Sequence, residues 1–218
     1  FDMKIILYFF EYILVLFIYI LFKILPLNLS IRFSSFLFVT FGKYSRANKT
    51  AMHNCRNVFP NFKDEKINSI VKKSWNNLGR TICELLKLNE IFHRNKIKYK
   101  KLENIEDCIK KGKQAIFIGI HQSNWEVLVP SLDRLGIYVG GIYRHINNIF
   151  INKLILNIRE KSLVSEKSFY TPKGRKSAND IVKAINNSLS IVLLIDQKDS
   201  SGEEVMFFNT KVKTQTGF

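Results

Sequence analysis

The feature that most constrains the fold of this chain is an alternation of short apolar runs with amphipathic segments between residues 115 and 195. Residues 116–120, 137–142 and 190–195 are rich in Ile, Val and Leu, and each run has the length of an ordinary β-strand. The first and the last of these runs are predicted to be buried. Because strands that alternate with helices form βαβ units, the sequence predicts an α/β protein with a mostly parallel sheet flanked by helices.

The segments around these strands carry helix signals. Apolar residues recur at three- and four-residue steps from Ile67 to Leu86, so residues 45–95 are predicted to be helical. Gly112 is the predicted C-cap of a short helix that precedes the first strand. Helices are predicted over residues 105–111, 125–135, 147–159 and 177–187. One further strand is predicted over residues 205–208, after a Ser-Ser-Gly turn.

The N-terminal part of the chain is an almost continuous apolar run over residues 3–25, interrupted only by Lys4, Glu11 and Lys23. About 18 of these residues are close to the lower limit for crossing a bilayer. A signal peptide and a buried helix are the alternatives, but no small-residue cleavage site follows the run. We therefore predict a transmembrane or membrane-anchor helix in residues 1–25 and a single domain in residues 26–218.

Aromatic and basic residues refine this membrane prediction. Tyr8, Tyr12 and Tyr19 are typical of a membrane–water interface. Basic residues after the apolar run outnumber the single Lys4 before it, and the positive-inside rule therefore predicts that the domain lies in the cytoplasm. Residues 30–44 are apolar and aromatic with basic ends, which fits a helix on the membrane surface and equally fits a core helix.

The chain is strongly basic, with 34 Lys and Arg against 18 Asp and Glu, which gives a net charge of +16. This excess predicts attraction to polyanions, whether nucleic acid, an anionic membrane or an acidic protein. The three cysteines match neither zinc nor redox spacing, so reduced thiols in a cytoplasmic domain are expected.

Polar residues follow three of the predicted strands, at His121 with Glu126, at Tyr143-Arg144 and at Asp196-Gln197. The carboxyl ends of parallel strands meet at one edge of a sheet, where open α/β folds bind their ligands. A histidine accepts a proton near neutral pH, and a nearby carboxylate can fix its tautomer. The pattern therefore predicts an acid–base pair of His121 and Glu126 at this edge.

Other kinds of site have weaker support. No third His or Cys stands at zinc spacing beside His121 and Glu126. Ser123 lacks the G-x-S-x-G turn of a nucleophile, and no glycine-rich phosphate loop is present. Arg144 and Arg159 are better candidates for binding phosphate through their guanidinium groups, although each could be an ordinary surface charge.

The block His121-Gln-Ser-Asn-Trp-Glu126 resembles the H-x4-[DE] motif of bacterial lipid A biosynthesis acyltransferases, which belong to the lysophospholipid acyltransferase superfamily. Further blocks similar to that family follow the family's order. They are Arg46-Ala-Asn48 with Asn54 and Phe59-Pro60, Trp75-Asn-Asn-Leu-Gly-Arg80 with Glu84, Tyr143-Arg144 with Asn147-Asn148 and Arg159, and Asp196-Gln197 with Phe207-Phe208 and Thr214. The chain departs from the family at His145 and Asn209, where Pro and Gly are usual. The family usually continues further, so this chain is expected to be incomplete at its C-terminus.

The resemblance implies transfer of a fatty acyl chain from acyl carrier protein, or from a coenzyme A thioester, to a hydroxyl of a lipid A precursor. His121 would be the general base and Glu126 would orient it. Arg144 or Arg159 would hold a lipid phosphate or the developing oxyanion. Substrate-binding roles are implied for Arg144, Arg159, Asp196, Gln197 and Asn124. No metal, cofactor or nucleic acid would be required, since the acyl thioester is a co-substrate.

Such an enzyme would act at the bacterial inner membrane, with its catalytic domain on the cytoplasmic face. Two alternatives remain open at this point. The same chemistry could serve another acceptor, such as a phosphatidylinositol mannoside or a lysophospholipid. A basic, membrane-tethered binding module without catalysis is the alternative from another class. The sequence leaves the acyl chain length, the donor and the oligomeric state undetermined.

Overall fold

A computed structural model describes the backbone of residues 3–214, and within that range all side chains except those of residues 107–109, 175 and 198–201. The described part of the chain forms two compact units. The first comprises residues 3–24 and 85–195, and the second comprises residues 25–84 and 196–214.

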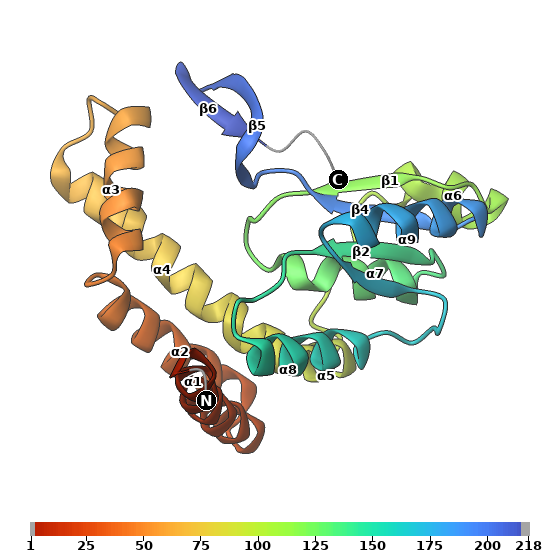
Figure 1. The fold of residues 1–218 in the computed structure, drawn as a ribbon, viewed down its shortest axis with the longest axis horizontal. Coiled ribbons are helices and arrows are strands. Elements are labelled where there is room, and N and C mark those ends of the chain that lie inside the picture. The colour runs from red at the N-terminus through yellow and green to blue at the C-terminus, as the bar shows by residue number, and fades with distance from the viewer. Residues whose placement is uncertain (1–2, 215–218) are drawn as a thin grey trace. The chain divides into compact units, whose positions relative to one another are not determined.

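The first unit contains a four-stranded sheet in which every neighbouring pair of strands is parallel (Figure 1). The strands are, in sheet order, β1 (Ile116–Gly119), β4 (Ser190–Leu194), β2 (Val139–Tyr143) and β3 (Phe169–Pro172). This arrangement confirms the predicted α/β class with a parallel sheet flanked by helices. Strand β3 was not predicted, because it is short and lacks the apolar runs of the other three.

The prediction that the first strand is buried is wrong. Strand β1 lies at the edge of the sheet, where it pairs with β4 alone. Ile116 and Ile118, which point to the same face, are 66% and 63% exposed, whereas Phe117 on the other face packs against the core cluster. Strand β4 has a neighbour on both sides and buries Ile191 and Val192. An apolar run identifies a strand, but its place in the sheet decides how much of it is covered.

Helices cover both faces of this sheet. Tyr170 of β3 packs against the core cluster that α7 (Leu128–Arg134) contributes to, and Arg159 of α8 (Ile149–Glu160) lies over Tyr143 on that same face. The next β3 residue, Thr171, points the other way and donates a 2.6 Å hydrogen bond to Asp180 of α9 (Arg175–Asn186). The core cluster consists of Val129, Leu132, Ile137, Val139 and Val192.

Local sequence explains several boundaries in the first unit. Gly112 has a φ of 59° and ends α6 (Glu106–Lys111), as the C-cap prediction required. The helix predicted over residues 125–135 begins instead as a 3-10 turn, η2 (Trp125–Val127), before α7. Pro130 explains this split, because its ring would clash with the Glu126 carbonyl in a continuous α-helix. The remaining short helices are α5 (Leu88–His93) and η1 (Leu102–Ile105).

The N-terminal apolar run forms the long helix α1 (Met3–Ile24), which contacts α8 within the first unit. By its length and composition α1 is long and apolar enough to cross a membrane. Most of its large apolar side chains are exposed, and Phe22 is the buried exception.

The second unit contains three helices and a hairpin. Helices α2 (Leu27–Gly42), α3 (Arg46–Val58) and α4 (Asp64–Leu86) follow one another, and the last two residues of α4 belong to the first unit. Strands β5 (Lys198–Phe207) and β6 (Thr210–Thr214) pair as an antiparallel hairpin, so the predicted strand over residues 205–208 is the end of a longer one. Helix α2 buries Ser34 and Ser35 and exposes aromatic residues such as Phe36, the reverse of an ordinary core helix.

Candidate active site

The histidine singled out by the sequence follows β1 directly. The chain turns sharply there, since the Gln122 amide donates a 2.7 Å hydrogen bond to the Ile120 carbonyl and Ser123 adopts a left-handed backbone with φ of 56°. A non-glycine residue in that region is uncommon and typical of functional turns. The turn presents His121, which is half-buried, at the carboxyl end of the sheet.

The carboxylate of Glu126 is buried, with 8% of the residue exposed, and is held from two sides. Arg159 donates to both of its oxygens, from Nε to Oε2 at 2.8 Å and from Nη2 to Oε1 at 2.7 Å. The indole Nε1 of Trp125 donates to Oε1 at 3.1 Å. This bidentate geometry fixes the carboxylate and compensates its charge, as a buried acidic group requires.

Trp125 links this ion pair to the histidine. Its ring meets the His121 imidazole edge to face, with centroids 4.9 Å apart and an interplanar angle of 63°. The same indole donates its hydrogen bond to Glu126, so the ion pair fixes the ring that His121 contacts. Trp125 is a site residue that sequence reasoning missed, although it stands inside the His121–Glu126 block.

Arg159 is positioned by the last turn of α8. Its guanidinium lies 5.6 Å from the centre of the Tyr143 ring at the end of β2, within cation–π range. Burial lowers the pKa of the Arg159 guanidinium, but the hydrogen bond and negative charge of Glu126 outweigh it, with help from Tyr170 and Tyr143, so the pKa is raised. Arg159 therefore stays charged and acts first as the partner of Glu126.

Tyr170 of β3 interacts electrostatically with both members of this ion pair, Glu126 and Arg159. Burial, followed by the negative charge of Glu126, raises the pKa of its phenol above the ordinary value. The hydroxyl thus remains protonated at physiological pH. Sequence reasoning missed Tyr170 because β3 itself was not predicted.

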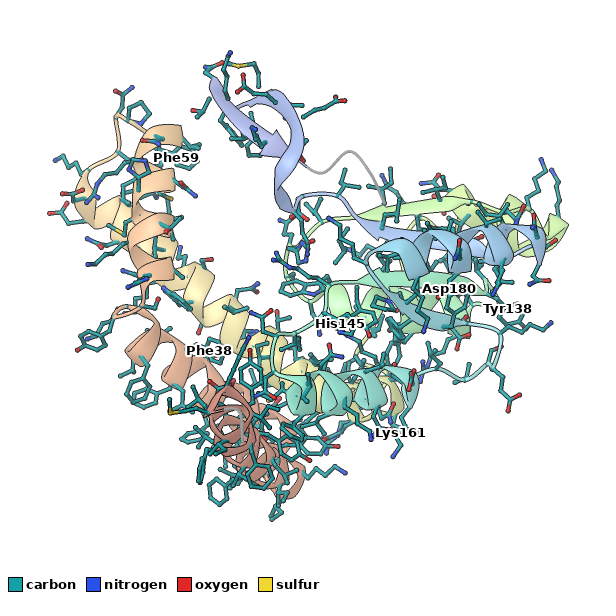
Figure 2. All side chains as sticks on the ribbon, in the orientation of Figure 1. Phe38, Phe59, Tyr138, His145, Lys161 and Asp180 are labelled. Atoms are coloured by element: carbon teal, nitrogen blue, oxygen red, sulfur yellow. The ribbon has the colours of Figure 1, made fainter. Side chains whose placement is uncertain are left out.

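Arg144 follows β2 at the same edge of the sheet, and its environment is the opposite of that of Arg159. It is exposed, and no hydrogen bond or ion pair joins it to any described residue. The next residue, His145, is also exposed (Figure 2). Its ring meets the Tyr143 ring edge to face, with centroids 5.6 Å apart. Of the two arginines predicted to bind phosphate, only Arg144 has its guanidinium open to solvent.

The side chain of Asn124, which was predicted to bind substrate, makes a hydrogen bond within the protein. Its side-chain oxygen accepts a 3.1 Å hydrogen bond from the Glu126 amide and caps η2. This cap fixes the direction in which the Glu126 side chain leaves the backbone.

Asp196 and Gln197 follow the last residue of the first unit and belong to the second. Asp196 is exposed and Gln197 half-buried. Before them, the Ile195 amide donates a 3.1 Å hydrogen bond to the Gly119 carbonyl, which ties the end of β4 to the end of β1. The substrate-binding role of Asp196 and Gln197 stays a prediction.

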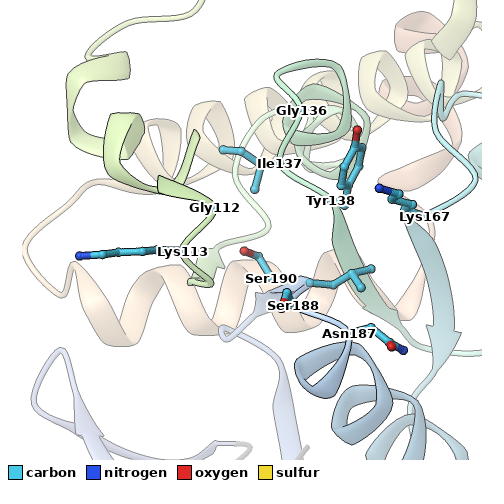
Figure 3. Close-up of a pocket in the computed structure, with 10 residues that line it drawn as sticks. Gly112, Lys113, Gly136, Ile137, Tyr138, Lys167, Asn187, Ser188 and Ser190 are labelled. Carbon is cyan, nitrogen blue, oxygen red and sulfur yellow. The ribbon is translucent and has the colours of Figure 1, made fainter. Parts of the chain in front are cut away.

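A pocket of about 560 Å³ opens at the other end of the sheet, beside the amino end of β4 (Figure 3). Lys113, Tyr138, Lys167 and Ser190 are among the residues that line it, and none of the predicted site residues does so. In the part of the chain that the structure describes, no three His, Cys, Asp or Glu side chains are grouped as metal ligands. The candidate site is therefore the cluster at the carboxyl edge, built from His121, Trp125, Glu126, Tyr143 and Arg159.

The fold and this edge define a class of protein, namely a parallel α/β domain with a long apolar N-terminal helix and polar residues gathered where its strands end. The chain belongs to the bacterial lipid A biosynthesis acyltransferase family, whose sequence model matches residues 2–218. Its chemistry is accordingly acyl transfer in lipid A biosynthesis. A comparison with curated proteins finds no match.

Proposed function

We propose that this protein transfers a fatty acyl chain from an acyl carrier protein thioester, or a coenzyme A thioester, to a hydroxyl of a membrane-bound lipid A precursor. The observation that carries the proposal is the placement of His121 on a sharp turn after β1, against an indole fixed by a buried ion pair. A base held in this way at the edge of a parallel sheet is suited to a hydroxyl that arrives from solvent or membrane.

In the proposed reaction, His121 removes the proton from the acceptor hydroxyl as its oxygen attacks the thioester carbonyl. The new ester C–O bond forms, the C–S bond breaks, and the proton held by the imidazole passes to the departing thiolate. No acyl-enzyme is needed, because a thioester is already activated. The proposal therefore calls for neither a metal nor a cofactor.

Glu126 has the role of fixing the surroundings of the base. Three hydrogen bonds from Arg159 and Trp125 occupy most of the roughly four acceptor positions of a carboxylate. One position on Oε2 is left over, which an imidazole N–H of His121 can use in the catalytic complex. The carboxylate would then orient the imidazole and stabilise its charged form.

The exposed Arg144 is proposed to bind a phosphate of the acceptor lipid through its planar guanidinium. Arg159 has donors beyond those used by Glu126, and these can reach the developing oxyanion. Asp196, Gln197 and Asn124 are proposed to position the acceptor sugar.

Partners and location follow from charge and from the apolar helix. The net charge of +16 favours both an acidic carrier protein and an anionic lipid. Helix α1 supports residence at a membrane. We assign this to the bacterial inner membrane, with the catalytic residues on the cytoplasmic face, where the acyl thioester donor is available.

The proposal is tested by acyl transfer from acyl carrier protein thioester to lipid A precursor with the variant His121→Ala. Loss of a general base lowers turnover by about 100-fold or more. The matched control is His93→Ala, which removes an exposed histidine at the end of α5 and should leave turnover unchanged. Wild-type turnover in His121→Ala would disprove the base assignment.

Parallel assays with a lysophospholipid and a phosphatidylinositol mannoside as acceptors decide between the acceptor classes. A wild-type protein that binds anionic vesicles or DNA but transfers no acyl chain to any acceptor would favour the binding-module alternative.

A further inference from the structure

Every polar residue of α1 lies on one side of the helix. With residues placed at about 100° intervals, the six residues that carry a charge or a hydroxyl fall in a sector of about 120°. They are Lys4, Tyr8, Glu11, Tyr12, Tyr19 and Lys23. The opposite side is apolar and exposed, with side chains such as Phe10, Ile13, Phe17 and Ile24 between 45% and 76% exposed. The tyrosines are thus grouped by face and not by the two ends of the helix.

The polar side of α1 is fastened to the first unit near its start. The Asn148 amide donates to the Glu11 carboxylate at 2.9 Å and to the Tyr8 carbonyl at 2.8 Å. Asn148 is only 4% exposed and also caps α8. The first aromatic residue of α8, Phe150, packs against Phe9 and Tyr12. The carboxylate of Glu11 therefore has a hydrogen-bond donor on the same face as the tyrosines.

A second attachment lies near the end of α1. The ammonium group of Lys87, which is 4% exposed, donates a 2.7 Å hydrogen bond to the Phe22 carbonyl and pairs with Glu90. From Glu11 to Phe22 the helix rises about 16 Å. The first unit thus holds α1 at two points separated by about half the thickness of a bilayer core.

These attachments are incompatible with a helix that crosses the bilayer while the domain stays outside. If α1 spanned the membrane, Asn148 and the start of α8 would be drawn deep into the hydrocarbon with Glu11. Helix α8 exposes Lys153, Asn157 and Glu160 at spacings of four and three residues, which makes a polar stripe. A stripe of this kind is costly in hydrocarbon.

We propose that α1 does not cross the membrane but lies in the plane of its surface. The apolar side enters the acyl-chain region of an anionic phospholipid bilayer, and the polar side faces the first unit through Asn148 and Lys87. The protein is then monotopic, and both ends of α1 are on the side of the catalytic residues. The basic excess of the chain favours an anionic leaflet. This inference does not depend on acyl transfer.

The test is the sidedness and depth of single cysteines in the full chain. Cys55 and Cys108 are replaced by Ser, while Cys83 is retained because it is buried. The protein is reconstituted into vesicles of phosphatidylethanolamine and phosphatidylglycerol. Met3→Cys reports on the start of α1, and Lys161→Cys reports on the exposed end of α8 (Figure 2).

A maleimide that cannot cross membranes is expected to label Met3→Cys and Lys161→Cys from the same side of the vesicle. In a second measurement, a fluorophore is attached through a single cysteine at Ile6, Ile13, Phe17 or Ile24. A quencher held at one depth in the acyl chains should quench all four fluorophores equally. The four positions share one face of the helix, so a helix in the plane places them at one depth.

Labelling of Met3→Cys only from the side opposite to Lys161→Cys would overturn the proposal, as would a depth that changes steadily from Ile6 to Ile24. Failure of lipid quenchers to reach any of the four positions would also overturn it, because the apolar face would then be covered by protein. Acyl transfer is measured separately on the same vesicles. If the labelling and quenching place α1 in the membrane plane but no acyl chain is transferred, only the proposed function is contradicted.

Discussion

The carboxyl edge of the sheet in the first unit and the α2–α4 contact in the second unit are built from opposite kinds of interaction. At the edge, a buried Glu126–Arg159 pair fixes the side chains through charge-assisted hydrogen bonds. Between α2 and α4, a Cβ added to Gly79 would lie 2.8 Å from the Ser35 Cα, and the Ser34 hydroxyl donates to the Gly79 carbonyl at 2.7 Å. The first region depends on complementary charge and the second on close backbone approach.

This difference determines what each region tolerates. Removing one member of a buried ion pair leaves an uncompensated charge, so the edge is sensitive to lost groups. A contact between small residues has no room for extra atoms, so the α2–α4 contact is sensitive to added groups.

Replacing Arg159 by Met should have the largest effect, because Glu126 would be left buried without its partner. We expect a loss of about 3–5 kcal/mol in the free energy of unfolding, measured by denaturant titration. Turnover of the remaining folded protein should also fall, because Arg159 no longer fixes Glu126, which accepts the hydrogen bond of Trp125, the residue that His121 contacts. The double variant Glu126→Gln/Arg159→Met should regain part of the stability without regaining turnover. A single variant as stable as the wild type would contradict the charge-based account.

Replacing Gly79 by Val should destabilise the second unit by about 1–3 kcal/mol, because the new side chain meets the backbone of α2. The expected turnover per folded molecule is that of the wild type. Lys72→Val on the exposed side of α4 is the matched control, and its change should stay below about 0.7 kcal/mol from helix propensity. Equal losses in the two variants would show that space at Gly79 is not limiting.

Ser34→Ala removes a group from the α2–α4 contact without adding any atoms. The loss of the hydroxyl that donates to the Gly79 carbonyl should cost about 1 kcal/mol, seen as a lower midpoint in chemical denaturation. A loss as large as that of Gly79→Val would show that hydrogen bonding, and not close approach, dominates this contact.

Arg144→Ala should have the smallest effect on stability, within about 0.5 kcal/mol, because this side chain is exposed. Its effect should appear in binding, as a higher KM for a phosphorylated acceptor with kcat little changed. Lys153→Ala, an exposed cation on α8, controls for general charge and should leave KM unchanged. An unaltered KM in Arg144→Ala would exclude the predicted phosphate contact.

Much of the fold could be predicted from local patterns. The strands around residues 116–119, 139–143 and 190–194, the helix over residues 64–86 and the cap at Gly112 all follow from periodicity and residue type. Strand β3 could not be found in this way, since Phe169-Tyr-Thr-Pro has neither length nor apolar alternation. The break at η2 carried a signal, Pro130, that a proline rule identifies once the helix register is known.

Several residues of the candidate site could be chosen from the sequence, but the contacts between them could not. His121, Glu126, Arg144 and Arg159 could be chosen because they follow strands or lie in the family blocks. The partner of Glu126 could not be chosen, because Arg159 is 33 residues away and only the packing of α8 on the sheet brings the two together. The aromatic residues Trp125 and Tyr143 have a role only in that arrangement.

Helix α1 shows the same division most clearly. Its length, its apolar composition and the grouping of its tyrosines on one face are properties of the sequence alone, because they depend on the helical repeat. Which face meets protein depends on Asn148, which lies 137 residues from Glu11 in the chain. Local interactions are encoded residue by residue, whereas buried polar groups select their partners only after the fold has excluded water from them.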